Sequence, residues 1–192
     1  MNLLTITYHS THYYALEIKG GKLLVDCGWP GSMAEFTAAA KRKGLDPREI
    51  KYIFVTHFHM DHAGLAQELK NLGAKLIVME SQADFIQPFN DYLKTKKVGH
   101  TALRTDDNLP LKFSESRAFL HSLGLAGEII PTPGHSPDHA TLLLDDGSAF
   151  TGDLPPLFLV TEEQTEIKAS WDTIHQRRIT RIYPSHGNSV ER

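Results

Sequence analysis

Residues 56–64, THFHMDHAG, place three histidines and one aspartate within six positions. The preceding YIFVT favours an extended strand. Because side chains alternate along a strand, His57 and His59 are expected to project to the same side and to bind one ion. Asp61 and His62 follow where the chain turns into a helix, within reach of a second ion. One histidine is usually structural, but four such groups this close together predict a metal site.

Three further turns supply side chains that would complete the site. His135 lies in TPGHS after an expected strand, Asp153 ends a strand in FTGD, and His186 lies in PSHG after the last expected strand. Each turn has Gly or Pro near the candidate ligand, and these residues allow tight turns that present a side chain at a strand end. The spacing differs from the helical H-E-x-x-H type of zinc site.

Composition limits the class of protein. The 192 residues, 41% of them hydrophobic, suit one domain over 1–192 with a core of ordinary size. A net charge of -3 gives no electrostatic footprint for nucleic acid, so a small-molecule substrate is expected as the partner. Cys27 is the only cysteine, which excludes an intrachain disulfide and a thiolate-rich metal site.

Targeting signals are not evident. The first residues, MNLLTITYHSTHYYAL, have neither a basic leader nor a long apolar run, and no stretch of about 18 apolar residues occurs. We therefore expect a cytoplasmic protein that does not associate with membranes. The oligomeric state is open.

The expected elements alternate between strands and helices. Strands fill the first 26 residues, and Asp26 ends the last of them. Ser32 and Glu35 form an S-x-x-E capping box that predicts a helix over SMAEFTAAAKRK, ending at Gly44. YIFV and AKLIVME read as buried strands around a helix from 63 to 72.

The second half of the chain reads similarly, after an irregular stretch. Residues 81–125 separate two well-patterned halves and are a candidate lid or substrate-binding insertion, in which SESRAFLHSLG forms a helix. A strand over EIIP and a hairpin with Asp146-Gly147 as its tight turn follow. A helix around residues 169–178 and a last strand at RIYPSHG complete an α/β architecture.

The motifs in this order, H-x-H-x-D-H, then H, D and H, resemble the metallo-β-lactamase superfamily of metallohydrolases. The resemblance covers most of the chain, from KLLVDCGWPG through THFHMDHAG, TPGHSPDH and FTGD to SHG. It implies a four-layer αββα sandwich: two mixed β-sheets face to face, helices outside, and the site at one edge.

The resemblance also implies a role for each motif residue. The ligands of the first ion would be His57, His59 and His135. The ligands of the second would be Asp61, His62 and His186. Asp153 would bridge the two ions, Asp26 would orient ligands through hydrogen bonds, and Asp61 would also pass a proton to the leaving group.

Ligands of this kind suit two divalent ions, Zn²⁺ first, with Fe or Mn²⁺ as alternatives. Two ions about 3.5–4 Å apart can share a hydroxide, because a bound ion lowers the pKa of water from 15.7 toward about 7. The second ion can polarise the substrate carbonyl or bind the leaving oxygen. The chemistry predicted is hydrolysis.

The branch of the family follows from departures at single positions. Zinc β-lactamases have a cysteine where Asp153 stands, so antibiotic hydrolysis is not expected and Cys27 is a small buried residue. Flavodiiron proteins have glutamate where His59 stands, so an oxygen or nitric oxide reductase is not expected. Glyoxalase II has a basic helical region after the last motif, whereas only six residues follow His186. RNA-processing members have an additional RNA-binding arm and a basic surface. The net charge of -3 therefore argues against this branch.

The predicted function is therefore hydrolysis of a small carboxylic ester, lactone or thioester. The alternatives are phosphodiester hydrolysis by the same ion pair, and a non-catalytic metal-binding regulatory domain. Tyr13, Tyr14 and Tyr183 are candidate donors to a tetrahedral oxyanion, although packing is the usual role of tyrosine in a strand. His12 and His139 call for the same caution, and His139 is expected to orient ligands or to pack. His9, His100, His121 and His175 carry no ligand-like context and are expected at the surface.

Overall fold

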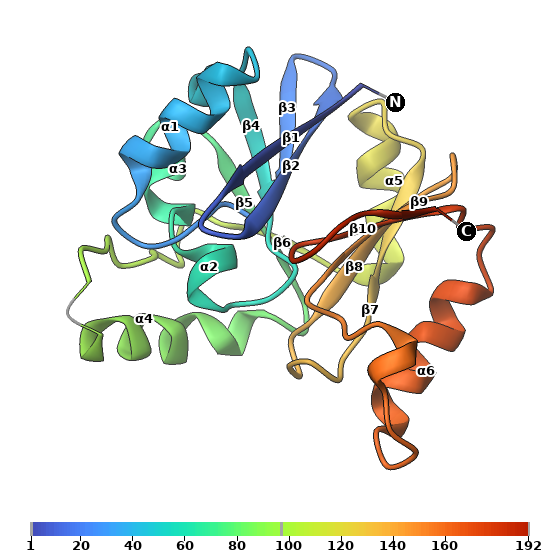
Figure 1. The fold of residues 1–192 in the computed structure, drawn as a ribbon. Helices are drawn as coiled ribbons and strands as arrows, with labels where there is room; N and C mark the ends of the chain where they lie inside the picture. The colour runs from blue at the N-terminus through green and yellow to red at the C-terminus, as the bar shows by residue number, and fades with distance from the viewer. Residues whose placement is uncertain (1, 97, 192) are drawn as a thin grey trace.

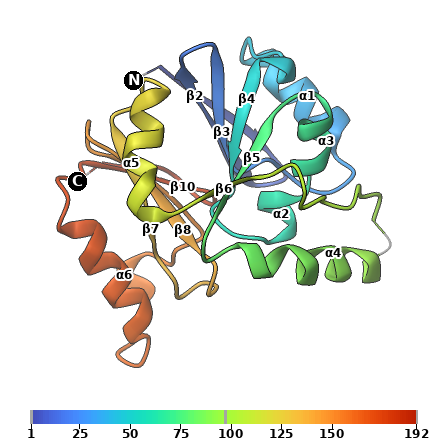
Figure 2. The same cartoon turned by 180° about the vertical axis from the view of Figure 1, so that it is seen from behind.

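Two β-sheets pack face to face with helices on their outer surfaces (Figure 1). The computed structural model describes residues 2–96 and 98–191. In Figure 1, α1 and α3 cover the outer face of the first sheet and α6 lies outside the second; the view from behind places α5 beside β7 (Figure 2). This arrangement confirms the predicted αββα sandwich.

The first sheet has the order β1-β2-β3-β4-β5-β6. Its first three strands are antiparallel neighbours, and β3 to β6 run parallel to one another. The strands are β1 (Leu3–Tyr8), β2 (Thr11–Ile18), β3 (Gly21–Val25), β4 (Ile50–Phe54), β5 (Lys75–Met79) and β6 (Leu109–Leu111).

The second sheet has the order β11-β10-β9-β8-β7 and is antiparallel except for the β9–β10 pair. The hairpin predicted at Asp146-Gly147 joins β8 to β9, and this prediction is confirmed. The strands are β7 (Gly127–Pro131), β8 (Ala140–Leu144), β9 (Ser148–Gly152), β10 (Arg181–Pro184) and β11 (Val190–Glu191).

Short helices connect these strands. The α-helices are α1 (Met33–Arg42), α2 (Met60–Ala63), α3 (Ala66–Asn71), α4 (Ile86–Thr95), α5 (Phe113–Ser122) and α6 (Thr165–His175). The 3₁₀ turns are η1 (Pro47–Glu49), η2 (Ala83–Phe85) and η3 (Leu157–Leu159). None of the helices within residues 2–96 and 98–191 has the length and apolar character needed to span a membrane.

Three apolar layers hold the sandwich together. The outer layers lie between the first sheet and α1, α3 and α4, and between the second sheet and α6. Between the sheets, Leu23 and Phe54 share a cluster with Leu142 and Phe150. Leu24, next to Leu23, belongs instead to the layer under α1. Because β3 is buried on both faces here, its second half reads in sequence as the continuous apolar run LLV.

Two details of the predicted helices were wrong. Ser32 makes no capping hydrogen bond to α1, because its hydroxyl donates to the carbonyl of Trp29 at 2.6 Å and also bonds the Tyr8 hydroxyl at 2.8 Å. The helix expected from 63 to 72 is present as α3 but begins three residues later, at Ala66, and the separate α2 precedes it at Met60–Ala63. Gly64 sits at the break, where a Cβ would lie 2.3 Å from the Pro30 nitrogen, so this close approach requires glycine.

The stretch 81–125 contributes to the sandwich. β6 pairs with β5 at the edge of the first sheet, and α5 packs on β7, so the helix expected in SESRAFLHSLG is confirmed. η2 and α4 come first, and the ring of Phe89 on α4 lies 5.8 Å from the ring of Phe58 beside the histidine motif. This earlier part of the segment therefore borders the candidate site.

Candidate metal centre

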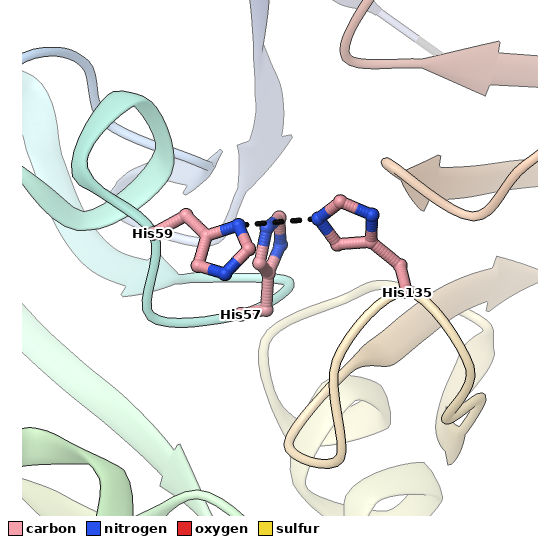
Figure 3. Close-up of side chains that lie close together, drawn as sticks. All are labelled: His57, His59 and His135. Atoms are coloured by element: carbon pink, nitrogen blue, oxygen red, sulfur yellow. Dashed lines mark hydrogen bonds between the residues drawn. The ribbon is translucent and has the colours of Figure 1, made fainter.

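Three of the predicted imidazoles converge from two loops. His57 and His59 follow β4, and His135 follows β7. One nitrogen from each lies within 4.8 Å of the others, and the rings point toward one another in Figure 3. The closest pair is His59 Nδ1 and His135 Nε2, 3.1 Å apart. We call His57, His59 and His135 the imidazole group.

The other four predicted ligands form a second group. Asp61 and His62 stand on α2, while Asp153 and His186 follow β9 and β10 in the second sheet. His186 Nε2 lies 3.0 Å from Asp61 Oδ2, and His62 Nε2 lies 3.3 Å from Asp153 Oδ2. We call Asp61, His62, Asp153 and His186 the carboxylate group.

Asp153 lies between the two groups. Its Oδ2 is 3.3 Å from His62 Nε2 in the carboxylate group and 3.7 Å from His135 Nε2 in the imidazole group. Asp153 therefore contacts candidate donor atoms of both groups.

The donor atoms fit divalent cations. His57 Nε2 is buried and has no hydrogen-bond partner among the residues that the structure describes, whereas His62 Nε2 lies 3.3 Å from carboxylate oxygens of both Asp61 and Asp153. A buried polar atom without a partner is costly, and a metal ion would supply the missing partner. Each ring is held through its other nitrogen, His57 by Thr56 and His62 by Asp26, as is typical of histidine ligands.

Asp26 connects the segments that carry the ligands. Its buried carboxylate accepts hydrogen bonds from the Thr56 amide at 2.7 Å, the Ser185 hydroxyl at 2.8 Å and His62 Nδ1 at 2.8 Å. Thr56 precedes His57 and Ser185 precedes the last motif histidine. The backbone of Asp26 has φ of +57°, a left-handed conformation that non-glycine residues rarely adopt.

The surroundings give the two groups opposite electrostatics. Burial, followed by the neighbouring histidines, lowers the pKa of His57 well below its usual value. Burial alone would lower the pKa of His62 too, but Asp26, with Asp153 and Asp61, raises it well above its usual value. Burial alone would raise the pKa of Asp61, but the hydrogen bond and charge of His62 lower it to about 2.

A family model described as the metallo-beta-lactamase superfamily matches residues 6–186. The chain belongs to the metallo-β-lactamase superfamily. This superfamily consists of metal-dependent hydrolases, which agrees with a ligand cluster at one edge of the sandwich.

Individual relatives of this superfamily are distant. A beta-lactamase-like protein 2 homolog of Caenorhabditis elegans is 26% identical over 192 residues, 97% of this chain and 59% of the worm protein. An N-acyl homoserine lactonase of Bacillus cereus is 28% identical over 155 residues, 69% of this chain and 57% of that enzyme. The chain thus spans about three fifths of the length of these curated relatives.

Solved structures support the same fold. A metallo-beta-lactamase family protein from Thermus thermophilus superposes with a TM-score of 0.76 at 22% identity, covering 99% of this chain and 74% of that one. The likeness concerns the fold of the superfamily.

Two residues that brace the imidazole group escaped the sequence analysis. Asp138 Oδ2 accepts a hydrogen bond from the Phe58 amide at 2.7 Å, which ties the loop of His135 to the loop between the two motif histidines. The buried Gln82 amide donates to the carbonyls of Val55 at 2.9 Å and Asp138 at 3.3 Å. Gln82 belongs to the stretch 81–125, where no sequence pattern pointed to a contact with this superfamily's ligand motifs.

The remaining candidates lie outside the two groups. Cys27 is fully buried and its thiol donates to the His62 carbonyl at 3.1 Å, so its expected structural role is confirmed. His139 is buried and bonds Thr132 Oγ1 through Nδ1 at 2.9 Å. The other histidines that belong to neither group are His9, His12, His100, His121 and His175.

The three tyrosines proposed as oxyanion donors have other contacts. The Tyr14 hydroxyl donates to the Pro184 carbonyl at 2.6 Å, and Tyr183 stacks on Phe150 with ring centroids 4.9 Å apart. Tyr13 is fully buried in the layer under α1, 6.3 Å from the Phe36 ring. Packing accounts for their positions.

Proposed function

We propose that this chain is a dinuclear metal-dependent hydrolase of a small carboxylic ester, lactone or thioester. The observation that carries the proposal is the pair of adjoining ligand groups with Asp153 between them. Such a pair suits two ions that act together on one substrate. The matched lactonase supports this substrate class, because lactone hydrolysis uses the same attack on a carbonyl carbon.

In this proposal each group would hold one ion: His57, His59 and His135 would hold the first, and Asp61, His62 and His186 the second. Asp153 would serve both, and the buried carboxylate of Asp26 positions His62 by accepting its Nδ1 hydrogen bond. Bound divalent ions supply water of low pKa and polarise the carbonyl. The ion pair is Zn²⁺ first, with Fe or Mn²⁺ as alternatives that the same ligands accept.

Asp61 has a second role in the proposal: its carboxylate would take up the proton that the attacking water releases and pass it to the leaving oxygen or sulfur. Its Oδ2 lies 3.0 Å from His186 Nε2 and 3.4 Å from the Thr11 hydroxyl, so the carboxylate is held in place from two sides. Held in this way, it can hand the proton over without a large movement.

A substrate panel tests the function. Protein loaded separately with Zn²⁺, Mn²⁺ and Fe²⁺ is assayed on p-nitrophenyl acetate, γ-butyrolactone, an acyl thioester and bis-p-nitrophenyl phosphate. We expect the highest kcat/KM on one of the three carboxylic substrates. A preference for the phosphate diester would assign the phosphodiesterase alternative. Tight metal binding without turnover of any substrate would assign the non-catalytic alternative.

A matched pair of variants guards against contaminating activity. Asp153→Asn removes a proposed bridging oxygen, whereas Asp172→Asn makes the same exchange at an exposed position on α6. The proposal expects turnover to be lost in the first variant and kept in the second. Equal turnover in both would contradict it.

A further inference from the structure

Two apolar pockets open onto the ligand cluster and share no lining residue. The first, which we call the C-terminal pocket, has a volume of about 660 Å³ and reaches His135, Asp153 and His186. Its apolar walls include Leu154, Leu157, Phe158, Trp171, Ile182 and Val190. This volume is that of a site for a small molecule.

The second, which we call the aromatic pocket, is lined mostly by residues 29–92 and is completed by Ser136, Pro137 and Asp138 from the loop of His135. It has a volume of about 570 Å³ and reaches His59 and Asp61. Its apolar walls include Trp29, Phe58, Phe85, Phe89 and Tyr92. In Figure 1, α4 lies below the first sheet and the segment before α6 lies below the second; α4 contributes Phe89 and Tyr92 to the aromatic pocket, and that segment contributes Leu157 and Phe158 to the C-terminal pocket.

Exposed apolar surface gathers at these pockets. Six large hydrophobic side chains are exposed among the described residues, and four of them line one of the two pockets. The four are Leu157, Phe158 and Val190 in the C-terminal pocket and Tyr92 in the aromatic pocket. Exposed apolar surface grouped around a polar site is characteristic of ligand binding.

The walls of the C-terminal pocket are braced from α6. The Trp171 indole donates to the Pro155 carbonyl at 2.7 Å, and the Ser170 hydroxyl donates to the Pro133 carbonyl at 2.7 Å. Pro155 belongs to the segment after Asp153, and Pro133 lies two residues before His135. One helix thus holds both the pocket wall and the ligand loops, so the pocket is preformed beside the donor atoms.

We propose that the substrate carries an apolar group on each side of its scissile bond, with the acyl chain in the C-terminal pocket and the leaving group in the aromatic pocket. This inference rests on the proposed function. The leaving group is assigned to the aromatic pocket because Asp61, which is the proposed proton donor to the leaving group, lines that pocket. In the reaction a water oxygen bonds to the carbonyl carbon and the bond to the leaving oxygen or sulfur breaks. The leaving group takes up a proton, which gives a carboxylate and an alcohol or thiol.

Two series of esters test each pocket separately. The first extends the acyl chain of p-nitrophenyl esters from acetate to octanoate. The second compares hexanoate esters of phenol and 4-butylphenol, whose leaving groups differ mainly in apolar size. Burial of one methylene should raise kcat/KM about threefold to fourfold until the pocket is filled. Turnover of acetate with no gain in either series would overturn the pocket assignment and leave the hydrolase proposal standing.

Matched substitutions link each series to its pocket. Leu157→Glu should lower the octanoate-to-acetate ratio at least tenfold, and Tyr92→Glu should lower the butylphenol-to-phenol ratio instead. Leu72→Glu is the control, because Leu72 is 40% exposed, close to the 38% of Leu157, and lines neither pocket. Equal effects of all three variants would overturn the assignment.

The chain's two tryptophans give a readout that needs no turnover. Trp171 lines the C-terminal pocket and Trp29 the aromatic pocket. In the Trp29→Phe variant, octanoate should change the Trp171 fluorescence at a concentration at least tenfold lower than acetate does. In the Trp171→Phe variant, 4-butylphenol should change the Trp29 fluorescence and octanoate should do so only weakly. Octanoate acting no better than acetate would contradict the proposal, whether or not any ester is hydrolysed.

Light scattering tests a different occupant of the C-terminal pocket. The proposal expects Leu157→Glu and Leu72→Glu to have the same molar mass in solution. A dimer that Leu157→Glu alone dissociates would assign the pocket to a second copy of this chain and overturn the acyl-chain assignment.

Discussion

The imidazole group and the carboxylate group are built in different ways. The imidazole group takes its three members from two loops, one after a strand of each sheet, and it is supported by Thr56 beside His57 and by Asp138 on the Phe58 amide. The carboxylate group takes its members from three segments in both sheets, and the buried Asp26 bonds His62 as well as the residues that precede the ligand segments.

This difference separates two ways of placing a ligand. Alternation along an extended segment is enough to bring His57 and His59 together, whereas His135 follows β7 of the second sheet, so this group also depends on the two sheets meeting. The carboxylate group depends on the two sheets meeting in the correct register, so a single carboxylate that bonds both sides has a large share in its geometry. Changes near the carboxylate group should therefore act on both ions, and changes near the imidazole group on one.

The largest effect is expected from Asp153→Ala, since this carboxylate contacts both groups. We expect loss of at least one of two ions per chain and a fall in kcat/KM of more than about 100-fold, beyond the range typical of a residue that only orients a ligand. Metal analysis after desalting and steady-state kinetics provide the measurement. Retention of two ions would show that Asp153 does not bridge them.

Asp26→Asn should have the next largest effect. The amide nitrogen cannot accept a hydrogen bond, so it would leave His62 Nδ1 or the Ser185 hydroxyl without an acceptor. We expect metal affinity to fall about 10- to 100-fold, measured by competition with a chromogenic chelator. Asp138→Asn is the contrast, because its remaining carbonyl oxygen can still accept from the Phe58 amide, and a loss below about threefold is expected. Equal losses of metal affinity in the two variants would show that Asp26 and Asp138 support the two groups equally, which would contradict the proposed difference.

Gly152→Ala tests the packing between the sheets just before Asp153. An added Cβ would lie 2.5 Å from Thr56 Oγ1 and 2.9 Å from His139 Nε2, at φ of +52°. We expect the free energy of unfolding to fall by about 1–3 kcal/mol beyond the loss in Gly20→Ala, measured by urea denaturation. Gly20 has φ of +82° with nothing within 4 Å of an added Cβ, so it reports backbone strain alone. Equal losses of unfolding free energy in the two variants would show that the sheets can move apart enough to accommodate the added Cβ at residue 152.

Ser185→Ala should have the smallest effect. Asp26 loses one donor but keeps those from Thr56 and His62. We expect stability to fall by about 1 kcal/mol, with two ions still bound. Thermal denaturation and metal analysis check this pair of results. Loss of an ion would show that Ser185 fixes the position of His186 more strongly than its single hydrogen bond implies.

Much of the site was predictable because its signals are local. Strand YIFV, the alternating histidines and the Gly-containing turns all act within a few residues, and the structure brings the seven predicted ligands into two adjoining groups. The capping box failed because Tyr8, distant in sequence, shares the Ser32 hydroxyl with the nearby Trp29 carbonyl. Gln82 and the two pockets depend on contacts between the halves of the sandwich, and no spacing in the sequence encodes such contacts.

The central claim is that the two groups hold two ions together, with Asp153 between them. X-ray diffraction from crystals of the zinc-loaded protein, collected on both sides of the zinc absorption edge, tests it most directly. Two anomalous peaks about 3.5–4 Å apart are expected, one among His57, His59 and His135 and the other among Asp61, His62 and His186. A single peak, or a peak outside these residues, would contradict it.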